Sequence, residues 1–413
     1  MLKVKIFVAF LIIFQLNCTP GVAPENATGE MSESGVKEEQ AEPEVGAAQL
    51  DAYLPMLAGK NVGMLVNHTS MVGDRHLVDI LLEKGVKIQS IFAPEHGFRG
   101  TADAGEHITD GKDPETGIPL VSLYGKNRKP QPEQLAGLDW VIFDIQDVGT
   151  RFYTYISSMS YMMDACADLG IQMLILDRPN PNGHYVDGPL VEVGHDSYVP
   201  FVGLHPVPIV HGMTVGEYAQ MVNGEGWLSE DLRCKLTVIP IENYTHQTVY
   251  ELPVAPSPNL PNMRSIYLYP SLCFFEGTVA SEGRGTDKQF QVYGHPDYPG
   301  GDFTFTPMPG PGSKHPKLEG QECHGYDLTG LDPMDIHDEA RIHLDYFIEF
   351  YRNFPDKENL FRKNNYFDTL AGSKKLREDI EAGKSEEEIR AGWKPDLDRY
   401  REMRRKYLLY PES

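Results

Sequence analysis

Short apolar runs alternate with amphipathic stretches through the first half of the chain. The runs at residues 61–66, 87–92, 120–123, 140–145, 171–176 and 207–210 are rich in Val, Ile, Leu and Phe, which favours strands. The stretches at 75–84, 155–169 and 215–222 have helical spacing. Unbroken apolar strands are typical of burial on both faces, and their alternation with helices indicates a doubly wound parallel sheet. We therefore predict an α/β fold with a Rossmann-like N-terminal domain.

The pattern changes near residues 236–241. Residues 250–330 are dense in Pro, Gly and aromatic side chains and show few clear helices. Helical periodicity returns at 336–351, 373–382, 385–393 and 397–406. We predict a domain boundary near residue 245, with the Rossmann-like domain at 47–245, a smaller α+β domain at 246–413, and the active-site cleft between them.

The N-terminus has the pattern of an export signal. Lys3 and Lys5 precede a short apolar run, residues 6–16, which is too short for a membrane-spanning helix. Cys18 follows at the position where a bacterial lipoprotein is cleaved and acylated, so we predict a signal peptide at 1–18 and a lipid anchor on Cys18. Residues 19–46 are rich in Glu, Gly, Ala, Pro and Ser, which predicts a disordered tether. A cleaved secretory signal is the alternative, because residues 15–17 lack the usual small side chains.

Charge and motifs exclude several classes. A formal net charge of −23 argues against a nucleic-acid partner, because no broad basic face would neutralise phosphates. The membrane contact that we predict is the lipid anchor alone. No CxxC spacing indicates a zinc ribbon, and neither a GxGxxG nor a Walker A motif follows the first strand. We expect no cofactor and no metal.

Polar residues follow nearly every predicted strand of the first half. Because the carboxyl ends of parallel strands share one edge, these residues are candidates for a common site. The candidates at the strand ends are Glu95, His96, Asp144, Asp147, Arg151, Asp177, Arg178, Asn180 and His211. So many titratable groups at these turns favour function for the edge as a whole, but not for any single residue.

Two segments of the second half carry similar groups. Glu276 is followed by Ser281-Glu282-Gly283-Arg284-Gly285-Thr286, in which glycines permit a tight bend around a ligand. Asn259 lies in a Pro-rich segment, Ser257-Pro258-Asn259-Leu260-Pro261-Asn262. Each segment could equally be a structural turn.

Several of these motifs resemble, in order and spacing, those of the NamZ-like exo-β-N-acetylmuramidases, formerly a domain of unknown function. They are Glu95-His96-Gly97, the stretch from Asp144 through Asp147 to Arg151, Asp177-Arg178-Pro179-Asn180-Pro181, Ser257-Pro258-Asn259 and Glu282-Gly283-Arg284-Gly285-Thr286. The resemblance covers residues 50–410. It implies an exo-acting glycosidase of cell-wall turnover that releases N-acetylmuramic acid from the non-reducing ends of peptidoglycan fragments, with muropeptides or disaccharides as partners.

Glycoside hydrolysis usually needs two carboxyl groups, a proton donor and a base or nucleophile. Glu95 is our first choice, because it follows a strand and because the resemblance points to it. For the second we prefer Glu282, followed by Glu276 and Asp147. The acetamido group of the substrate could also act as the nucleophile, and the sequence does not separate these routes.

N-acetylmuramic acid carries a lactyl carboxylate that N-acetylglucosamine lacks, and an arginine fork suits that group. The candidates are Arg284, Arg178 and Arg151, in falling order, although each could instead form a structural ion pair. The other residues that we assign to substrate binding are His96, Asp144, Asp147, Asp177, Asn180, His211, Asn259 and Thr286. Tyr153, Tyr155 and Phe290 could stack on sugar rings or belong to the core.

Two other functions stay open. A non-catalytic lipoprotein that binds peptidoglycan would keep the arginines and tolerate loss of Glu95. A metal-dependent hydrolase is suggested by His68, His96, His205 and His211 near strand ends, but no HxH or HxxxH spacing supports it.

Overall fold

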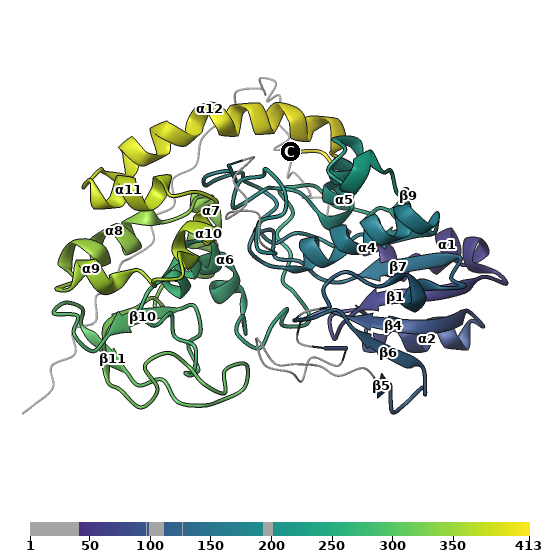
Figure 1. Cartoon of the computed structure of the whole chain (residues 1–413), viewed down its shortest axis with the longest axis horizontal. Helices are drawn as coiled ribbons and strands as arrows, with labels where there is room; N and C mark the ends of the chain where they lie inside the picture. The colour runs from purple at the N-terminus through teal and green to yellow at the C-terminus, as the bar shows by residue number, and fades with distance from the viewer. Residues whose placement is uncertain (1–40, 96, 99–110, 126, 193–200) are drawn as a thin grey trace, which may run out of the picture. The chain divides into compact units, whose positions relative to one another are not determined.

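The structure is a computed structural model that describes residues 41–95, 97–98, 111–125, 127–192 and 201–413. In this part of the chain, a seven-stranded sheet occupies the first half (Figure 1). Its strands lie in the order β5 (Gly111–Lys112), β6 (Pro119–Ser122), β4 (Lys87–Ala93), β1 (Asn61–Val66), β7 (Trp140–Asp144), β8 (Gln172–Leu176) and β9 (Lys235–Ile239). All neighbouring strands are parallel except β5. The strand order reverses at β1, which confirms the predicted Rossmann-like, doubly wound sheet.

Helices cover both faces of this sheet, which explains why its strands are apolar throughout. Met64 and Leu65 are neighbours in β1 and belong to two different cores. The core around Met64 includes α1 (Leu50–Leu57) and α2 (Leu77–Glu83), and the core around Leu65 includes α4 (Tyr155–Leu169) and α5 (Val215–Gly224). Successive side chains of a strand point to opposite faces, so both faces exclude water.

The helices around the sheet begin and end at recognisable residues. α4 ends at Gly170, whose φ of 69° is the left-handed conformation that glycine adopts at low cost. α5 begins with a capping box, in which the Thr214 hydroxyl accepts from the Glu217 amide and the Glu217 carboxylate accepts from the Thr214 amide. Gly170 thus explains why the predicted helix at 155–169 ends where it does, and the capping box explains where α5 begins.

The second half of the described chain is mainly helical, with one small antiparallel sheet (Figure 1). The sheet has the order β10 (Val292–His295), β12 (Cys323–Asp327) and β11 (Phe303–Phe305). Its longer helices are α6 (Met263–Leu272), α7 (Pro333–Glu339), α8 (Leu344–Asn353), α10 (Tyr366–Ala371), α11 (Lys375–Glu381) and α12 (Glu386–Arg404). This confirms a smaller C-terminal α+β region. Residues 41–413 form one compact unit, and the domain boundary at residue 245 stays a prediction.

The strand predicted at residues 207–210 is wrong. Only Val210 forms isolated bridges, to Thr150 and Asp187, and the Ile209 carbonyl accepts from the Arg151 amide at 2.7 Å. The segment therefore bonds to the loop after β7 instead of joining the sheet. The last parallel strand is instead β9. It lies where the alternation of apolar runs and helices ends, and no strand was predicted there.

Helix boundaries in the second half also differ from the prediction. The single helix predicted at 336–351 is two helices, because Ala340 has a φ of 49° and the Ile342 amide donates to Asp187 at 2.7 Å. Conversely, residues 386–404 form one helix through Pro395, although a break was predicted before Leu397. The apolar side chains of α12, Ile389, Trp393, Leu397 and Tyr400, stay buried along one face, so packing outweighs the missing proline donor.

Both ends of the described chain pack against the sheet. Glu44 forms a bridge with Glu242, and the Gly46 amide donates to the Asp177 carbonyl at 2.9 Å. The fold therefore includes residues 41–46, which had been assigned to the tether. The rest of the predicted tether and the signal peptide, with Cys18, lie outside the described residues.

The four described cysteines are buried free thiols: Cys166, Cys234, Cys273 and Cys323. Among the described helices, none has the length and apolar character of a membrane span.

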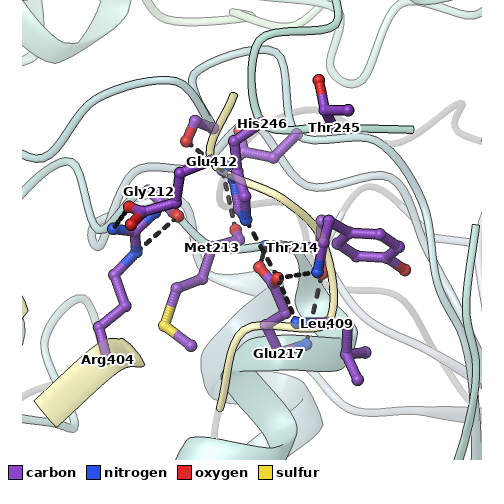
Figure 2. A network of polar contacts seen from close by, with 12 residues as sticks. Gly212, Met213, Thr214, Glu217, Thr245, His246, Arg404, Leu409 and Glu412 are labelled. Atoms are coloured by element: carbon purple, nitrogen blue, oxygen red, sulfur yellow. Dashed lines mark hydrogen bonds and ion pairs between the residues drawn. The ribbon is translucent and has the colours of Figure 1, made fainter. Parts of the chain in front are cut away.

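The C-terminal tail, residues 408–413, closes over α5. Figure 2 shows the buried carboxylate of Glu217 between His246, the Thr214 amide and the tail. Its Oε1 accepts from the amide of Leu409 at 2.8 Å and from Nε2 of His246 at 3.0 Å. Arg404 donates to the Gly212 carbonyl and pairs with Glu412 at 2.7 Å. These bonds tie the tail to the sheet half of the chain.

Candidate active site

A cavity of about 420 Å³ lies beyond the carboxyl ends of β4 and β6 and receives side chains from both sides of residue 245. The loops after these strands, the start of α4, the segment from 257 to 290, and α10 all contribute to it. Its lining residues are Glu95, Tyr124, Arg128, Phe152, Tyr153, Thr154, Tyr155, Phe201, Val202, Ser257, Asn259, Leu260, Tyr269, Glu276, Arg284, Phe290, Tyr366 and Thr369. Aromatic walls with a few charged groups suit a sugar ligand.

Glu95 lies two residues after the end of β4 and its carboxyl group is partly exposed to the cavity. The Thr154 hydroxyl donates to its Oε2 at 3.2 Å. Oε1 has no hydrogen-bond partner among the described residues. Burial and the nearby charge of Glu95 raise the pKa of Tyr155, so its hydroxyl stays a neutral donor at neutral pH. Glu95 is thus held at one oxygen and open to a ligand at the other.

Arg284 connects the two other predicted catalytic carboxylates. Its Nη2 lies 2.7 Å from Glu276, and its Nε lies 3.3 Å from Glu282. Burial opposes its charge, but Glu276 and Glu282 raise the pKa of Arg284 overall. Glu282 is 1% exposed, pairs also with Lys317 at 2.7 Å and does not line the cavity. Our preference for Glu282 over Glu276 as the second carboxyl therefore has no support in its position, because its charge is already balanced behind the wall.

The Gly-rich turn that contains these residues is shaped by its own backbone. Gly283 and Gly285 have φ values of 83° and 81°, and a Cβ on Gly283 would lie 2.6 Å from the Lys288 carbonyl. Thr286, predicted to bind substrate, donates to the Gly283 carbonyl at 2.7 Å and does not line the cavity. The turn places Arg284 at the cavity, and the prediction that it bends around a ligand stays a prediction.

Asn259 lines the cavity as predicted. Its Nδ2 donates to the Gly312 carbonyl at 2.9 Å, which orients the amide group. Its buried Oδ1 has no partner in the described part of the chain. A buried acceptor without a donor is costly, so this oxygen is suited to an N–H or O–H group of a ligand.

Arg151 and the Asp144–Arg178 pair, predicted to bind substrate, belong to the scaffold. Arg151 is 1% exposed and donates to the carbonyls of Pro189, Val207 and Leu370. Arg178 forms a bidentate pair with Asp144 at 2.5 and 3.0 Å. None of the three lines the cavity, so their predicted role in substrate binding has no support in their positions.

Asp177 and Asn180 also turn away from the cavity. Asp177 accepts from the hydroxyls of Tyr410 and Thr214 at 2.6 and 2.7 Å, and burial raises its pKa to about 6. Asn180 donates to the Met213 carbonyl at 2.8 Å. These groups fasten the end of β8 to α5 and to the C-terminal tail.

Asp147 and His211 form a buried pair outside the cavity lining. His211 Nε2 lies 3.9 Å from Asp147 Oδ2, which accepts from the Gly149 amide. Burial raises the pKa of Asp147 to about 7, while burial and two nearby arginines lower that of His211 to about 3. His211 is therefore neutral near neutral pH, and the two groups are not an ion pair. Asp147 does not line the cavity, so its predicted role as a second carboxyl group has no support in its position.

Comparison with known families identifies the family to which the chain belongs. The model of the exo-β-N-acetylmuramidase NamZ N-terminal domain matches residues 62–264, and that of the NamZ C-terminal domain matches residues 267–410. The chain belongs to the NamZ family. This confirms the family indicated by the sequence motifs.

Similar proteins cover nearly the whole chain. The peptidoglycan β-N-acetylmuramidase NamZ of Bacillus subtilis (strain 168) is 39% identical over 388 residues, which is 87% of this chain and 89% of that protein. Two crystal structures of DUF1343 family proteins from Bacteroides fragilis NCTC 9343 have the same fold. One has a TM-score of 0.83 and 49% identity, covering 90% of this chain and 100% of its own. The other has a TM-score of 0.73 and 28% identity, covering 89% and 99%.

Several cavity residues of this NamZ family member were missed by the sequence analysis. They are Tyr124, Arg128, Phe152, Thr154, Phe201, Val202, Tyr269, Tyr366 and Thr369. Tyr124 and Arg128 follow the strand predicted at 120–123. The rule that residues after a strand end are candidates for the site therefore applies to both of them. Tyr366 and Thr369 lie on α10, which follows no predicted strand, so the position of strand ends gives no indication of them.

The described histidines that suggested a metal site have separate partners. His68 bonds to the Ala255 carbonyl, and His205 stacks on Trp227 with ring centroids 5.2 Å apart. His96 lies outside the described residues. Within the residues that the structure describes, no group of three or more His, Cys, Asp or Glu side chains could hold a metal ion.

Proposed function

We propose that this protein is an exo-β-N-acetylmuramidase that hydrolyses the glycosidic bond of a non-reducing-end N-acetylmuramic acid in peptidoglycan fragments. The observation that carries the proposal is the open carboxyl oxygen of Glu95 in an aromatic cavity, in a chain of the NamZ family. The Bacillus subtilis relative is a peptidoglycan β-N-acetylmuramidase, which supports the same reaction class here.

In this proposal Glu95 transfers the proton to the leaving oxygen. Thr154 fixes one carboxyl oxygen of Glu95 and leaves the other free to face the glycosidic bond. Glu276 is the second carboxyl group of the cavity, oriented by its pair with Arg284. The separation of two such carboxyl groups decides whether an enzyme inverts or retains configuration. Asn259 Oδ1 is placed to accept from a hydroxyl group or from the acetamido N–H of the sugar.

A pair of chromogenic substrates tests this function. We expect the protein to release the chromophore from an aryl β-N-acetylmuramide, and far more slowly from the matching β-N-acetylglucosaminide. The two sugars differ only in the lactyl ether and carry the same aryl leaving group. A difference in kcat/KM between them therefore reports recognition of the lactyl group. Equal rates on both sugars would contradict muramic acid specificity, and no turnover of either would contradict the activity.

We also propose that the protein is exported to the bacterial cell envelope, facing the periplasm or the cell surface, and anchored by lipid on Cys18. The support is the short apolar run at residues 6–16, preceded by Lys3 and Lys5. A lipid on Cys18 would hold the catalytic fold near its polymeric substrate through the tether.

Substitution of Cys18 tests the anchor. Cys18→Ala removes the acylation site, so we expect the protein to move from the membrane fraction to the soluble exported fraction, or to remain as an uncleaved precursor. Immunoblots of separated fractions report the change, and Cys166→Ala, at a buried free thiol, is the matched control. Processed wild-type protein in the soluble exported fraction, together with processed Cys18→Ala in the same fraction, would contradict the anchor and favour a cleaved secretory signal.

A further inference from the structure

The charged groups of the cavity are unequally paired. Of the two arginines that line it, Arg284 is bound to Glu276 and Glu282. Arg128, by contrast, has no ion pair or hydrogen bond from its guanidinium to any described residue. A third carboxylate on Arg284 would have to compete with two that are already in place. Among the described residues that line the cavity, Arg128 is therefore the cation that is available to an anionic ligand.

The position of Arg128 is set by its neighbours. The preceding Asn127 donates to the Ser122 carbonyl at the end of β6. The following Lys129 pairs with Asp164 of α4, which also accepts from Ser229. These two anchors hold the loop at the carboxyl edge of the sheet, where ligands bind in doubly wound folds. Arg128 itself is exposed and lines the cavity.

An aromatic platform orients the guanidinium. The Cζ atom of Arg128 lies 4.6 Å from the centroid of the Phe201 ring. Phe201 is 6% exposed and stacks on Tyr161 of α4, with centroids 5.7 Å apart and an interplanar angle of 21°. This contact with the aromatic ring uses none of the N–H donors of the guanidinium in a hydrogen bond. The fork of donors therefore stays free for a planar anion.

We propose that Arg128 binds the lactyl carboxylate of N-acetylmuramic acid and so sets the preference for this sugar, an inference that rests on the proposed function. A formal net charge of −23 gives the protein no general attraction for an anionic sugar, so recognition of the carboxylate depends on a local cation such as Arg128. Arg128 replaces Arg284, Arg178 and Arg151 as the reader of this group. It acts as a specificity-determining residue and takes no part in proton transfer.

The test varies the enzyme and the lactyl group together. The substrates are an aryl β-N-acetylmuramide with a free lactyl carboxylate and the same compound with a lactyl amide. A hydrogen-bonded ion pair of this type corresponds to a factor of about 10 to 100. We expect Arg128→Ala to lower kcat/KM by about this factor on the carboxylate substrate and to leave the amide substrate nearly unchanged. Arg128→Lys, which keeps the charge without the fork, should lie between wild type and Arg128→Ala.

Two further arms separate the explanations. Lys129→Ala removes a neighbouring cation that anchors the loop without lining the cavity. If it abolishes the carboxylate preference as fully as Arg128→Ala does, the effect comes from the loop and the proposal is wrong. An unchanged carboxylate preference in Arg128→Ala would also overturn it. Calorimetric titration of wild type and Arg128→Ala with N-acetylmuramic acid gives a readout without turnover. Tight binding that requires Arg128, in a protein without hydrolysis, would support the site and contradict the enzymatic function.

Discussion

Replacing Glu95 with glutamine is expected to lower kcat by about 100- to 10,000-fold, the range that general acid–base groups contribute. Glutamine keeps the shape of the side chain and can still accept from Thr154, but it can neither donate an acidic proton nor carry charge. Glu95 is partly exposed in a loop after β4, so stability should change little. Turnover and thermal unfolding of the same preparation separate the two effects. Glu133→Gln, on the exposed face of α3 (Pro132–Leu135), is the matched control.

The leaving group then identifies the role of Glu95. If it is the proton donor, an aryl substrate with an acidic leaving group should partly rescue Glu95→Gln, whereas a natural disaccharide should not. If it is the nucleophile or base, both substrates should fail together. Near-normal hydrolysis of a disaccharide would remove Glu95 from the mechanism and leave Glu276 as the carboxyl to test. Muramic acid binding without any turnover in wild type would revive the non-catalytic alternative.

The second large effect is expected on stability. Arg178→Met should lower the free energy of unfolding by about 3–5 kcal/mol, because it leaves the Asp144 carboxylate buried without its partner. Asp144 and Arg178 are 0% and 4% exposed, and the pair lies between the ends of β7 and β8. Urea unfolding measures the change, and kcat per folded molecule should be retained because neither residue lines the cavity.

Two comparisons make the Arg178 result interpretable. The double variant Arg178→Met with Asp144→Leu removes both charges and should recover part of the lost stability. Lys394→Met breaks an exposed pair with Asp398 and should cost at most about 1 kcal/mol. If Arg178→Met instead folds stably and loses affinity for muramic acid, Arg178 is a ligand-binding residue after all.

Local patterns predicted much of the fold, because burial and capping leave a direct trace in the sequence. The strand at 61–66 and the helix at 155–169 have the predicted bounds, the first from its apolar run and the second from Gly170. The errors arise where a side chain that is distant in the sequence forms a hydrogen bond with a backbone group. The Arg151 guanidinium donates to the Val207 carbonyl, and the Asp187 carboxylate accepts from the Ile342 amide at the break between α7 and α8. No local pattern records such partners.

The candidate site was harder to predict, for a related reason. Residues after strand ends do reach one edge, but a sequence does not say whether a side chain turns to solvent or to the backbone behind it. Glu95, Glu276, Asn259 and Arg284 line the cavity, whereas Arg151, Asp144 and Arg178 are bonded within the scaffold. Arginine beside aspartate is equally typical of both situations. Charge pairing, visible only in three dimensions, separates Arg128 from the other arginines.

The docking of the C-terminal tail has a consequence for the order in which the chain folds during synthesis. Glu217 and Leu409 are 192 residues apart, and Asp177 and Tyr410 are 233 residues apart, yet each pair is joined by a hydrogen bond. A ribosome-bound chain that ends before residue 408 already contains β8 and α5. The buried carboxylates of Asp177 and Glu217 still lack the donors that Tyr410 and Leu409 supply. The N-terminal sheet therefore reaches its final stability only after nearly all of the polypeptide has been made.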